Sequence, residues 1–127
     1  MDIILDTHTF LWFIGGNDEI STIIKNKITN PKTVKYISIA SIWEIAIKLN
    51  IGKLHLDFDF EKIGEIIYQN GFEILDLSLN HILDLSNLEN HHKDPFDRII
   101  ISQAKTEKLG IITKDSNFKY YKVKTIW

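Results

Sequence analysis

Short apolar runs alternate with amphipathic segments along the whole chain. The runs are a few residues long and lack a helical period, whereas the amphipathic segments repeat apolar residues every three or four positions. The runs predict strands at residues 2–6, 34–37, 72–77, 111–113 and 123–127. The amphipathic segments predict helices at residues 7–14, 18–30, 38–49, 60–70, 80–89 and 95–109.

Glycine and proline mark the expected helix ends, at Gly15-Gly16, Asn30-Pro31, Gly52, Gly71 and Gly110. Strands that alternate with helices predict an α/β fold, with a central, mainly parallel sheet of about four to five strands and helices on both faces. No repeat, low-complexity tract or long linker divides the chain. We therefore expect residues 1–127 to form a single domain.

The composition excludes several kinds of site. The chain has 127 residues, 44% of them hydrophobic, which suffices for one core without disulfides. Because it has no cysteine, a thiol nucleophile, an iron–sulfur cluster and a cysteine zinc finger are excluded. The apolar runs are too short to span a membrane, and no basic region follows Met1 as in a secretory signal. We expect a cytoplasmic protein.

The net charge of −2 conceals an uneven distribution of charge. Residues 1–104 carry a net charge of −6, whereas residues 105–127 carry six lysines against two acids. Phe118, Tyr120 and Tyr121 lie among these lysines. Aromatic rings beside cations are typical of surfaces that stack on unpaired bases and neutralise phosphates. The alternative is a solvated edge whose aromatic rings belong to the core.

Two aspartates follow predicted strands. Asp6 ends the first strand, and Asp115 comes two residues after Thr113, at the end of the fourth. In open parallel sheets, ligands bind beyond the carboxyl ends of the strands. A buried carboxylate at such a position needs a partner or a cation. The alternatives are a helix N-cap for Asp6 and a turn for Asp115.

The predicted helix at 38–49 is apolar except for a narrow polar stripe. Ser41, Glu44 and Lys48 occupy positions i, i+3 and i+7, so they share one face. A polar stripe on a buried helix suits a groove or an internal polar site better than open water. Ser41 and Glu44 also match a capping box, although Ser38 is an equally good cap.

A fourth carboxylate comes from the segment His92-Lys-Asp-Pro-Phe-Asp97-Arg98. Asp94 before Pro95 predicts a helix start with Asp94 as the N-cap, which places Asp97 in the first turn. Asp97 there either complements the helix dipole or points into the same cleft as Asp6. Three roles are open for Arg98, the only arginine: it braces Asp97, it pairs with another acid, or it contacts phosphate.

These carboxylates form a set of hard oxygen ligands, which suits Mg²⁺ or Mn²⁺. Such ions serve phosphodiester hydrolysis, because they activate water and neutralise charge on the phosphoryl oxygens. His91 and His92 are adjacent, and adjacent residues rarely ligate one metal together, so zinc is disfavoured. His8 fits a packed or substrate-side residue better than a ligand. The expected ligands are Asp6, Glu44, Asp97 and Asp115.

Four motifs in this order resemble a known family. They are Asp6-Thr-His-Thr-Phe-Leu-Trp12, Ser41-Ile-Trp-Glu44-Ile-Ala-Ile-Lys48 with Gly52-Lys-Leu54, His92-Lys-Asp-Pro-Phe-Asp97-Arg98 with Gln103-Ala104, and Thr113-Lys-Asp115 with Phe118. Together they resemble the PIN-domain ribonucleases, and most closely the VapC-like toxin nucleases of bacterial type II toxin–antitoxin modules. The resemblance runs from residue 2 to residue 127.

This resemblance implies a PIN fold, Mg²⁺ or Mn²⁺ dependence and endonucleolytic cleavage of RNA. The mechanism that we expect is in-line attack on the phosphodiester by metal-activated hydroxide, which leaves a 5′-phosphate and a 3′-hydroxyl. The resemblance also implies a homodimer and an antitoxin encoded alongside. Asp6 and Asp97 are then the principal metal ligands, Glu44 completes the inner or outer shell, and Asp115 orients water or holds a second ion. The supporting hydroxyls are Thr7, Thr113 and Ser41. The basic candidates for RNA contacts are Lys48, His92, Lys93, Arg98, Lys114 and Lys119.

Other functional classes fit the residues less well. A phospho-receiver domain needs an acceptor aspartate after a central strand, for which Asp76 is a superficial candidate, but the usual acid pair near the first strand is absent. A haloacid-dehalogenase-like phosphatase needs an aspartate where His8 stands. The remaining alternative is a PIN-like module that binds RNA or protein without cutting. The presence of all four acids argues against it.

Overall fold

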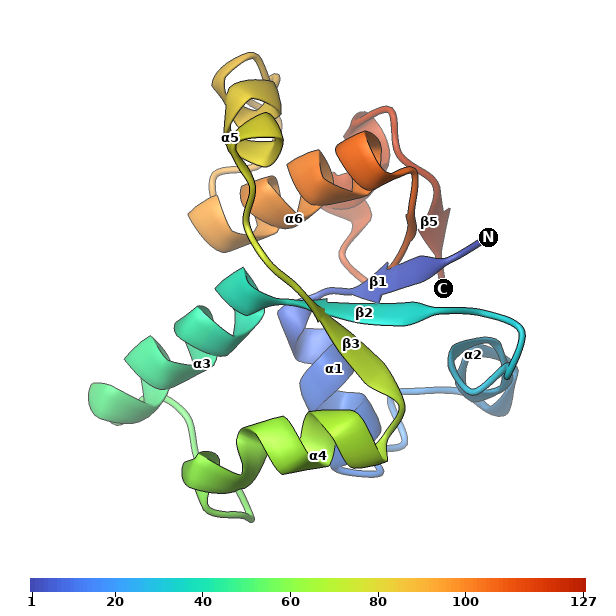
Figure 1. The fold of residues 1–127 in the computed structure, drawn as a ribbon, viewed down its shortest axis with the longest axis vertical. Coiled ribbons are helices and arrows are strands. Elements are labelled where there is room, and N and C mark those ends of the chain that lie inside the picture. The colour runs from blue at the N-terminus through green and yellow to red at the C-terminus, as the bar shows by residue number, and fades with distance from the viewer.

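The computed structural model describes residues 1–127 and contains one five-stranded sheet (Figure 1). The strand order is β3-β2-β1-β4-β5, and all four neighbouring pairs are parallel. The strands are β1 (Ile3–Leu5), β2 (Lys35–Ser38), β3 (Phe72–Leu75), β4 (Gly110–Ile112) and β5 (Thr125–Ile126). The predicted α/β fold is therefore confirmed. Asp76 follows β3 at the edge of the sheet, not in its centre, which removes the support for an acceptor aspartate.

Six α-helices and two short 3₁₀ helices surround the sheet. They are α1 (Thr7–Ile14), α2 (Thr22–Ile28), α3 (Ile39–Asn50), η1 (Phe60–Lys62), α4 (Ile63–Gln69), α5 (Leu79–Ser86), α6 (Pro95–Glu107) and η2 (Ser116–Tyr120). The helix expected at 18–30 is shorter, because Ser21 caps α2 by accepting from the backbone N–H of Ile24. The sequence pattern did not predict η2. No helix is both long and apolar enough to cross a membrane.

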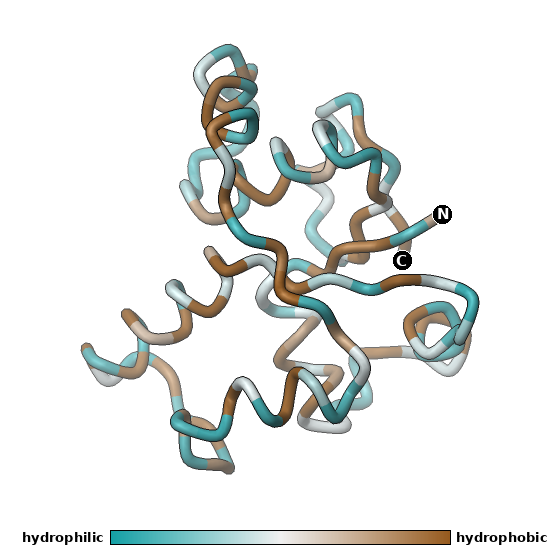
Figure 2. The backbone as a smooth tube through the Cα atoms, in the orientation of Figure 1, coloured by the Kyte–Doolittle hydropathy of each residue, from teal (hydrophilic) through white to brown (hydrophobic).

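Two hydrophobic cores cover the two faces of the sheet, as the alternation within β1 illustrates. Ile3 and Leu5 join side chains of α1, α2, α3 and α4 in one core, whereas Ile4 joins side chains of α6 and η2 in the other. In Figure 2, the mostly brown tube of β1 lies between helices on its two sides. The prediction of helices on both faces is therefore confirmed.

The parallel arrangement brings the carboxyl ends of the strands to one edge of the sheet. Leu5 at the end of β1 pairs with Ile112 at the end of β4. The next residues, Asp6 and Thr113, therefore leave the sheet side by side. Ser38 ends β2 and also caps α3, so this helix starts at the same edge.

The end of α6 differs from the expectation. Gly110 does not terminate this helix, because Lys108 provides the left-handed residue with φ of 58°. Gly110 instead begins β4, where an added Cβ would lie 3.0 Å from Sδ of Met1 and 3.1 Å from Cδ1 of Ile126. The glycine therefore allows close packing of β4 against its neighbours.

Candidate functional site

Asp6 is buried at the junction of β1 and α1, with only 5% of its surface exposed. Its Oδ1 accepts from the backbone N–H of Thr9 at 2.9 Å, which makes Asp6 the N-cap of α1. Its Oδ2 accepts from the hydroxyl of Thr113 at 2.5 Å. The capping interpretation of Asp6 is thus correct, but capping does not consume the carboxylate, since each oxygen keeps a further lone pair.

The polar stripe of α3 faces this junction. The hydroxyl of Thr7 donates to Oγ of Ser41 at 2.9 Å, and both side chains are buried. Glu44 is also buried, at 4% exposure, and its Oε2 lies 2.7 Å from Nζ of Lys48. This hydrogen bond raises the pKa of Lys48, against the opposing effect of burial. The capping-box interpretation is wrong, because Ser38 caps α3.

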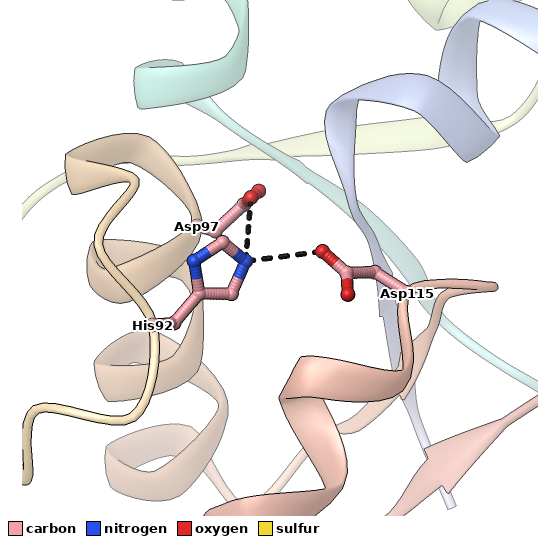
Figure 3. Close-up of side chains that lie close together, drawn as sticks. All are labelled: His92, Asp97 and Asp115. Carbon is pink, nitrogen blue, oxygen red and sulfur yellow. Dashed lines mark hydrogen bonds and ion pairs between the residues drawn. The ribbon is translucent and has the colours of Figure 1, made fainter.

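The first turn of α6 carries the next carboxylate. Oδ1 of Asp94 accepts from the backbone N–H groups of Phe96 and Asp97, both at 2.9 Å, and Pro95 opens the helix. The predicted capping role of Asp94 is confirmed. Because the cap fixes the start of α6, the side chain of Asp97 points toward the edge where Asp115 lies (Figure 3).

His92 lies between Asp97 and Asp115, as Figure 3 shows. Its Nε2 is 3.1 Å from Oδ2 of Asp97 and 3.0 Å from Oδ2 of Asp115. The three ligand-type atoms lie within 4.8 Å of one another. The side chain of His92 is 11% exposed, and that of Asp115 is 35% exposed. The turn interpretation of Asp115 also holds, because its Oδ1 accepts from the N–H of Asn117.

The hydrogen bonds of His92 indicate where its ring proton resides. The backbone N–H of Asp94 donates to Nδ1 of His92 at 3.2 Å, so Nδ1 presents its lone pair. The proton is then on Nε2, which donates toward both Asp97 and Asp115. A metal ligand has to offer a lone pair. In this orientation His92 is therefore a donor that joins two carboxylates and not itself a ligand.

Arg98 and Tyr121 hold the loop that carries His92. The guanidinium of Arg98 donates to the carbonyl oxygens of Glu89 and His92, at 2.9 and 3.2 Å. The hydroxyl of Tyr121 accepts from the N–H groups of His91 and His92 and donates to the carbonyl of Glu89. Arg98 forms no ion pair with an acid, so the predictions that it braces Asp97 or pairs with another carboxylate are wrong.

The aromatic residues of the basic segment divide between core and surface. Phe118 and Tyr121 are buried, at 0% and 7% exposure, and belong to the core on the α6 face. Phe118 also packs edge-on against the ring of His92, with centroids 5.6 Å apart. These two rings cannot stack on a nucleic-acid base, so the core interpretation is correct for them. Only Tyr120 is exposed.

Asp6, Glu44, Asp97 and Asp115 are here called the carboxylate cluster, and the charges of the other three members act on Asp97. Its pKa is raised from 3.8 to about 8, first by burial and then by the charges of Asp94, Asp6, Glu44 and Asp115. The contact with Nε2 of His92 does not outweigh these effects. The four predicted carboxylates are therefore near enough to act on one another, and they come from the residue after β1, from α3, from α6 and from the segment after β4. Among their ligand atoms, those of Asp97 and Asp115 lie within 4.8 Å of each other and of His92.

The cluster fits a bound dication. Oε1 of Glu44 is buried and has no hydrogen-bond partner, although its Oε2 is paired with Lys48. An orphaned carboxylate oxygen is costly unless a cation or water satisfies it. The donor set consists of carboxylate oxygens, which suits Mg²⁺ or Mn²⁺ better than softer ions.

The six basic residues expected to contact RNA lie in different surroundings. Lys48 is paired with Glu44, and His92 and Arg98 are engaged in hydrogen bonds within the protein. Lys93, Lys114 and Lys119 are exposed, and Nζ of Lys114 pairs with Oε2 of Glu19 at 2.7 Å.

The comparison with family models decides the classification. The model of the PIN domain matches residues 3–124. The chain belongs to the PIN-domain family. The resemblance deduced from the four motifs is therefore confirmed. No curated protein sequence matches this PIN domain.

Solved structures with this fold include toxin–antitoxin complexes. The PIN domain is similar to VapBC-1 from nontypeable Haemophilus influenzae, with a TM-score of 0.73 and 17% identity over 99% of this chain and 97% of that chain. It is also similar to VapBC2 from Rickettsia felis bound to a promoter DNA fragment, with a TM-score of 0.72 and 17% identity over 99% and 98% of the two chains. A toxin–antitoxin complex from Klebsiella pneumoniae has a TM-score of 0.68 and 16% identity over 99% and 97%.

Sequence reasoning missed two residues that border the cluster. The sequence indicates His92 only as an RNA contact or a disfavoured zinc ligand, because its partner Asp115 is 23 residues away. Trp12 lines a pocket with Asp6 and Asp115, together with His8. The available signal was the spacing of His8 and Trp12, which are four residues apart in the helix that follows Asp6. This spacing places both rings on one face of the helix.

The raised pKa of Asp97 predicts how the stability of the metal-free PIN domain depends on pH. Between about pH 4 and 8 the unfolded chain has released this proton while the folded protein retains it, so the free energy of unfolding falls as pH rises. Asp97→Asn removes this effect. We expect it to raise stability at pH 7.5 by roughly 1 to 3 kcal/mol, with little change at pH 4.

Urea denaturation with EDTA at the two pH values measures this difference. Asp57→Asn is the matched control, because the side chain of Asp57 is fully exposed and should leave the profile unchanged. An Asp97→Asn protein less stable than the unaltered chain at pH 7.5 would contradict the assignment of Asp97 as the strained carboxylate.

The donor role of His92 predicts that two substitutions differ in metal affinity. His92→Asn can keep the acceptor for the N–H of Asp94 but removes the donor at Nε2, whereas His92→Gln can keep that donor. Without this donor, no hydrogen bond joins Asp97 to Asp115, and the two side chains are no longer held together. We expect His92→Asn to weaken Mn²⁺ binding by about 10-fold or more and His92→Gln to weaken it less.

Isothermal titration of Mn²⁺ into each purified variant tests this. His91→Asn is the control, because the ring of His91 contacts Glu89 instead of the cluster. Equal Mn²⁺ affinities for His92→Asn and the unaltered chain would show that the donor does not organise the carboxylates.

Proposed function

We propose that this PIN domain is a metal-dependent endoribonuclease and the toxin of a type II toxin–antitoxin system. The observation that carries the proposal is the close placement of Asp97 and Asp115 beside the buried, unpaired Oε1 of Glu44 and the buried Asp6. Burial and the charges of these acids raise the pKa of Asp97 to about 8. A protein gains no stability from gathering carboxylates in this way, whereas a site for a dication requires it. We take residues 1–127 to act as one domain.

In this proposal the carboxylates hold Mg²⁺ or Mn²⁺. Asp6 and Asp97 are the principal ligands, Glu44 contributes its unpaired Oε1, and Asp115 orients water or holds a second ion. The ion supplies a lowered pKa for bound water and neutralises charge that develops on the phosphoryl oxygens.

The other residues of the site position these carboxylates. The hydroxyl of Thr113 fixes Oδ2 of Asp6 and also accepts from the N–H of Asp115, so it links two acids. Thr7 and Ser41 join α1 to α3 and so place Glu44. The chain needs no side-chain nucleophile, and in-line attack by water leaves a 5′-phosphate and a 3′-hydroxyl.

The proposed partners are RNA and a cognate antitoxin protein. The antitoxin is supported by the fold shared with the toxin–antitoxin complex from Klebsiella pneumoniae. Exposed Lys93, Lys114 and Lys119 are candidates for contacts with RNA phosphates. A cytoplasmic location, where RNA is present, follows from this proposal.

We also propose a homodimer, supported by an apolar groove of about 330 Å³ between α3, α5 and α6. Trp43 on α3 is 60% exposed and packs edge-on against Phe96, and Ile82 on α5 is 50% exposed. No charged residue lines the groove. An uncharged apolar surface is complementary to a second copy of itself, as a two-fold interface requires.

Cleavage of RNA by the purified chain tests the proposed activity. We expect cleavage of a single-stranded RNA with Mn²⁺ or Mg²⁺, none with EDTA, and mapped ends that carry a 5′-phosphate and a 3′-hydroxyl. Asp97→Asn should reduce the rate on the order of 100-fold or more, because the ion loses a principal ligand.

The matched control is Asp76→Asn, which removes an exposed acid after the edge strand β3 and should leave the rate unchanged. Binding of RNA without cleavage under every metal condition would favour the alternative, a catalytically silent module. Equal cleavage rates for Asp97→Asn and the unaltered chain would disprove the ligand assignment.

Sedimentation of the purified chain tests the homodimer. We expect a dimer whose dissociation constant rises by roughly 30-fold or more in Ile82→Glu, because a charge is then buried against apolar side chains. Ile23→Glu, at a 70% exposed position on α2, is the control and should sediment as the unaltered chain does. A monomeric unaltered chain at high concentration would refute the proposal.

A further inference from the structure

A pocket of about 280 Å³ adjoins the carboxylate cluster. Its lining residues are Asp6, His8, Trp12, Lys114 and Asp115, and Nζ of Lys114 pairs with Oε2 of Glu19 at 2.7 Å. The pocket therefore joins the proposed reaction centre to aromatic surface and to a cation. None of the roles assigned above uses its aromatic part.

The aromatic part of the pocket extends into a cluster of three rings, here called the Trp12 cluster. His8 and Trp12 have centroids 6.1 Å apart, and Trp12 and Trp127 have centroids 6.0 Å apart. His8 is exposed, Trp12 is half-buried and Trp127 is 43% exposed. These rings therefore keep surface in contact with water.

The Trp12 cluster is not explained by packing of the fold. Phe10 and Phe13 are the aromatic residues with which α1 enters the core, and Trp12 and Trp127 belong to neither hydrophobic core. His8 and Trp12 lie one turn apart on α1, whose first turn is capped by Asp6. The helix start that orients the carboxylate therefore also orients these rings.

We propose that the Trp12 cluster stacks one unpaired base of the RNA substrate, next to the phosphodiester bond that is cleaved. This inference rests on the proposed ribonuclease function. Base stacking on aromatic side chains is the usual way in which proteins hold single-stranded RNA near a site. Lys114 lines the same pocket, and its ion pair with exposed Glu19 is a surface contact that it can exchange for a neighbouring phosphate.

The size of the pocket limits the ligand. Its volume of about 280 Å³ is at the lower limit for small-molecule sites, which suits one base better than a stacked pair. A base within a duplex presents its faces to neighbouring bases, so it cannot enter without being unpaired. The Trp12 cluster therefore selects single-stranded RNA and bases that stack strongly.

Binding of short RNAs to the cleavage-deficient Asp97→Asn chain tests the inference without turnover. A labelled single-stranded RNA is compared with versions in which one nucleotide at a time lacks its base, in the Asp97→Asn chain and in the same chain with Trp12→Ala. We expect one abasic position to weaken binding by about 5- to 100-fold, and Trp12→Ala to weaken binding of the intact RNA equally. The two changes together should cost no more than either alone.

Two further variants isolate stacking from other effects. Trp12→Phe keeps an aromatic face and should recover most of the affinity. Tyr68→Ala removes a ring that is 83% exposed on α4, outside the pocket, and should bind all RNAs as the parent does. The abasic series needs no change at Trp12, so it remains informative if Trp12→Ala folds poorly.

The outcomes separate this inference from the proposed function. If the unaltered chain cleaves RNA, but every abasic RNA binds as well as the intact one or the losses from Trp12→Ala and the abasic position add, the stacking site is refuted and the nuclease proposal stands. If the unaltered chain neither binds nor cleaves RNA, both are refuted.

Discussion

The repulsion among carboxylates at one edge of the sheet is the constraint that organises this structure. Asp97 holds its proton to a pKa of about 8 because it is buried among four other acids. The surrounding contacts restrain these acids: Thr113 fixes Asp6, Lys48 pairs with Glu44, and His92 joins Asp97 to Asp115. Each contact satisfies one carboxylate oxygen and leaves lone pairs free, which is what an arriving dication needs.

The fold supplies the acids from segments that are distant in sequence. The parallel pairing of β1 with β4 places Asp6 beside Thr113. The N-caps of α1 and α6 fix where these helices start, and these starts orient the side chains of Asp6 and Asp97. Capping and ligation are therefore compatible. The two hydrophobic cores stabilise the sheet away from this edge, so the fold tolerates an electrostatically strained site.

Local sequence signals predicted the parts of the structure that local physics determines. The strands, the helix after Asp6 and the cap formed by Asp94 and Pro95 follow from periodicity and from caps, and the structure has them. The role of His92 was not predictable in this way, because its partner Asp115 is reached only through the tertiary fold. The same holds for Arg98, whose acceptors are backbone carbonyls in a loop that has no regular pattern.

The aromatic residues of the basic C-terminal segment show why local composition alone is a poor guide to a nucleic-acid-binding surface. Phe118 and Tyr121 lie among lysines in the sequence, yet both are buried, because η2, which contains Phe118 and ends just before Tyr121, turns them toward the core. Trp12 has no such basic neighbours in sequence, but the segment that follows β4 brings Lys114 to the same pocket. A combination of ring and cation is therefore a property of the folded edge. The same edge gathers the acids, which repel phosphate when no metal is bound. The neighbouring ring of Trp12 and the side chain of Lys114 are the groups that we propose hold RNA there.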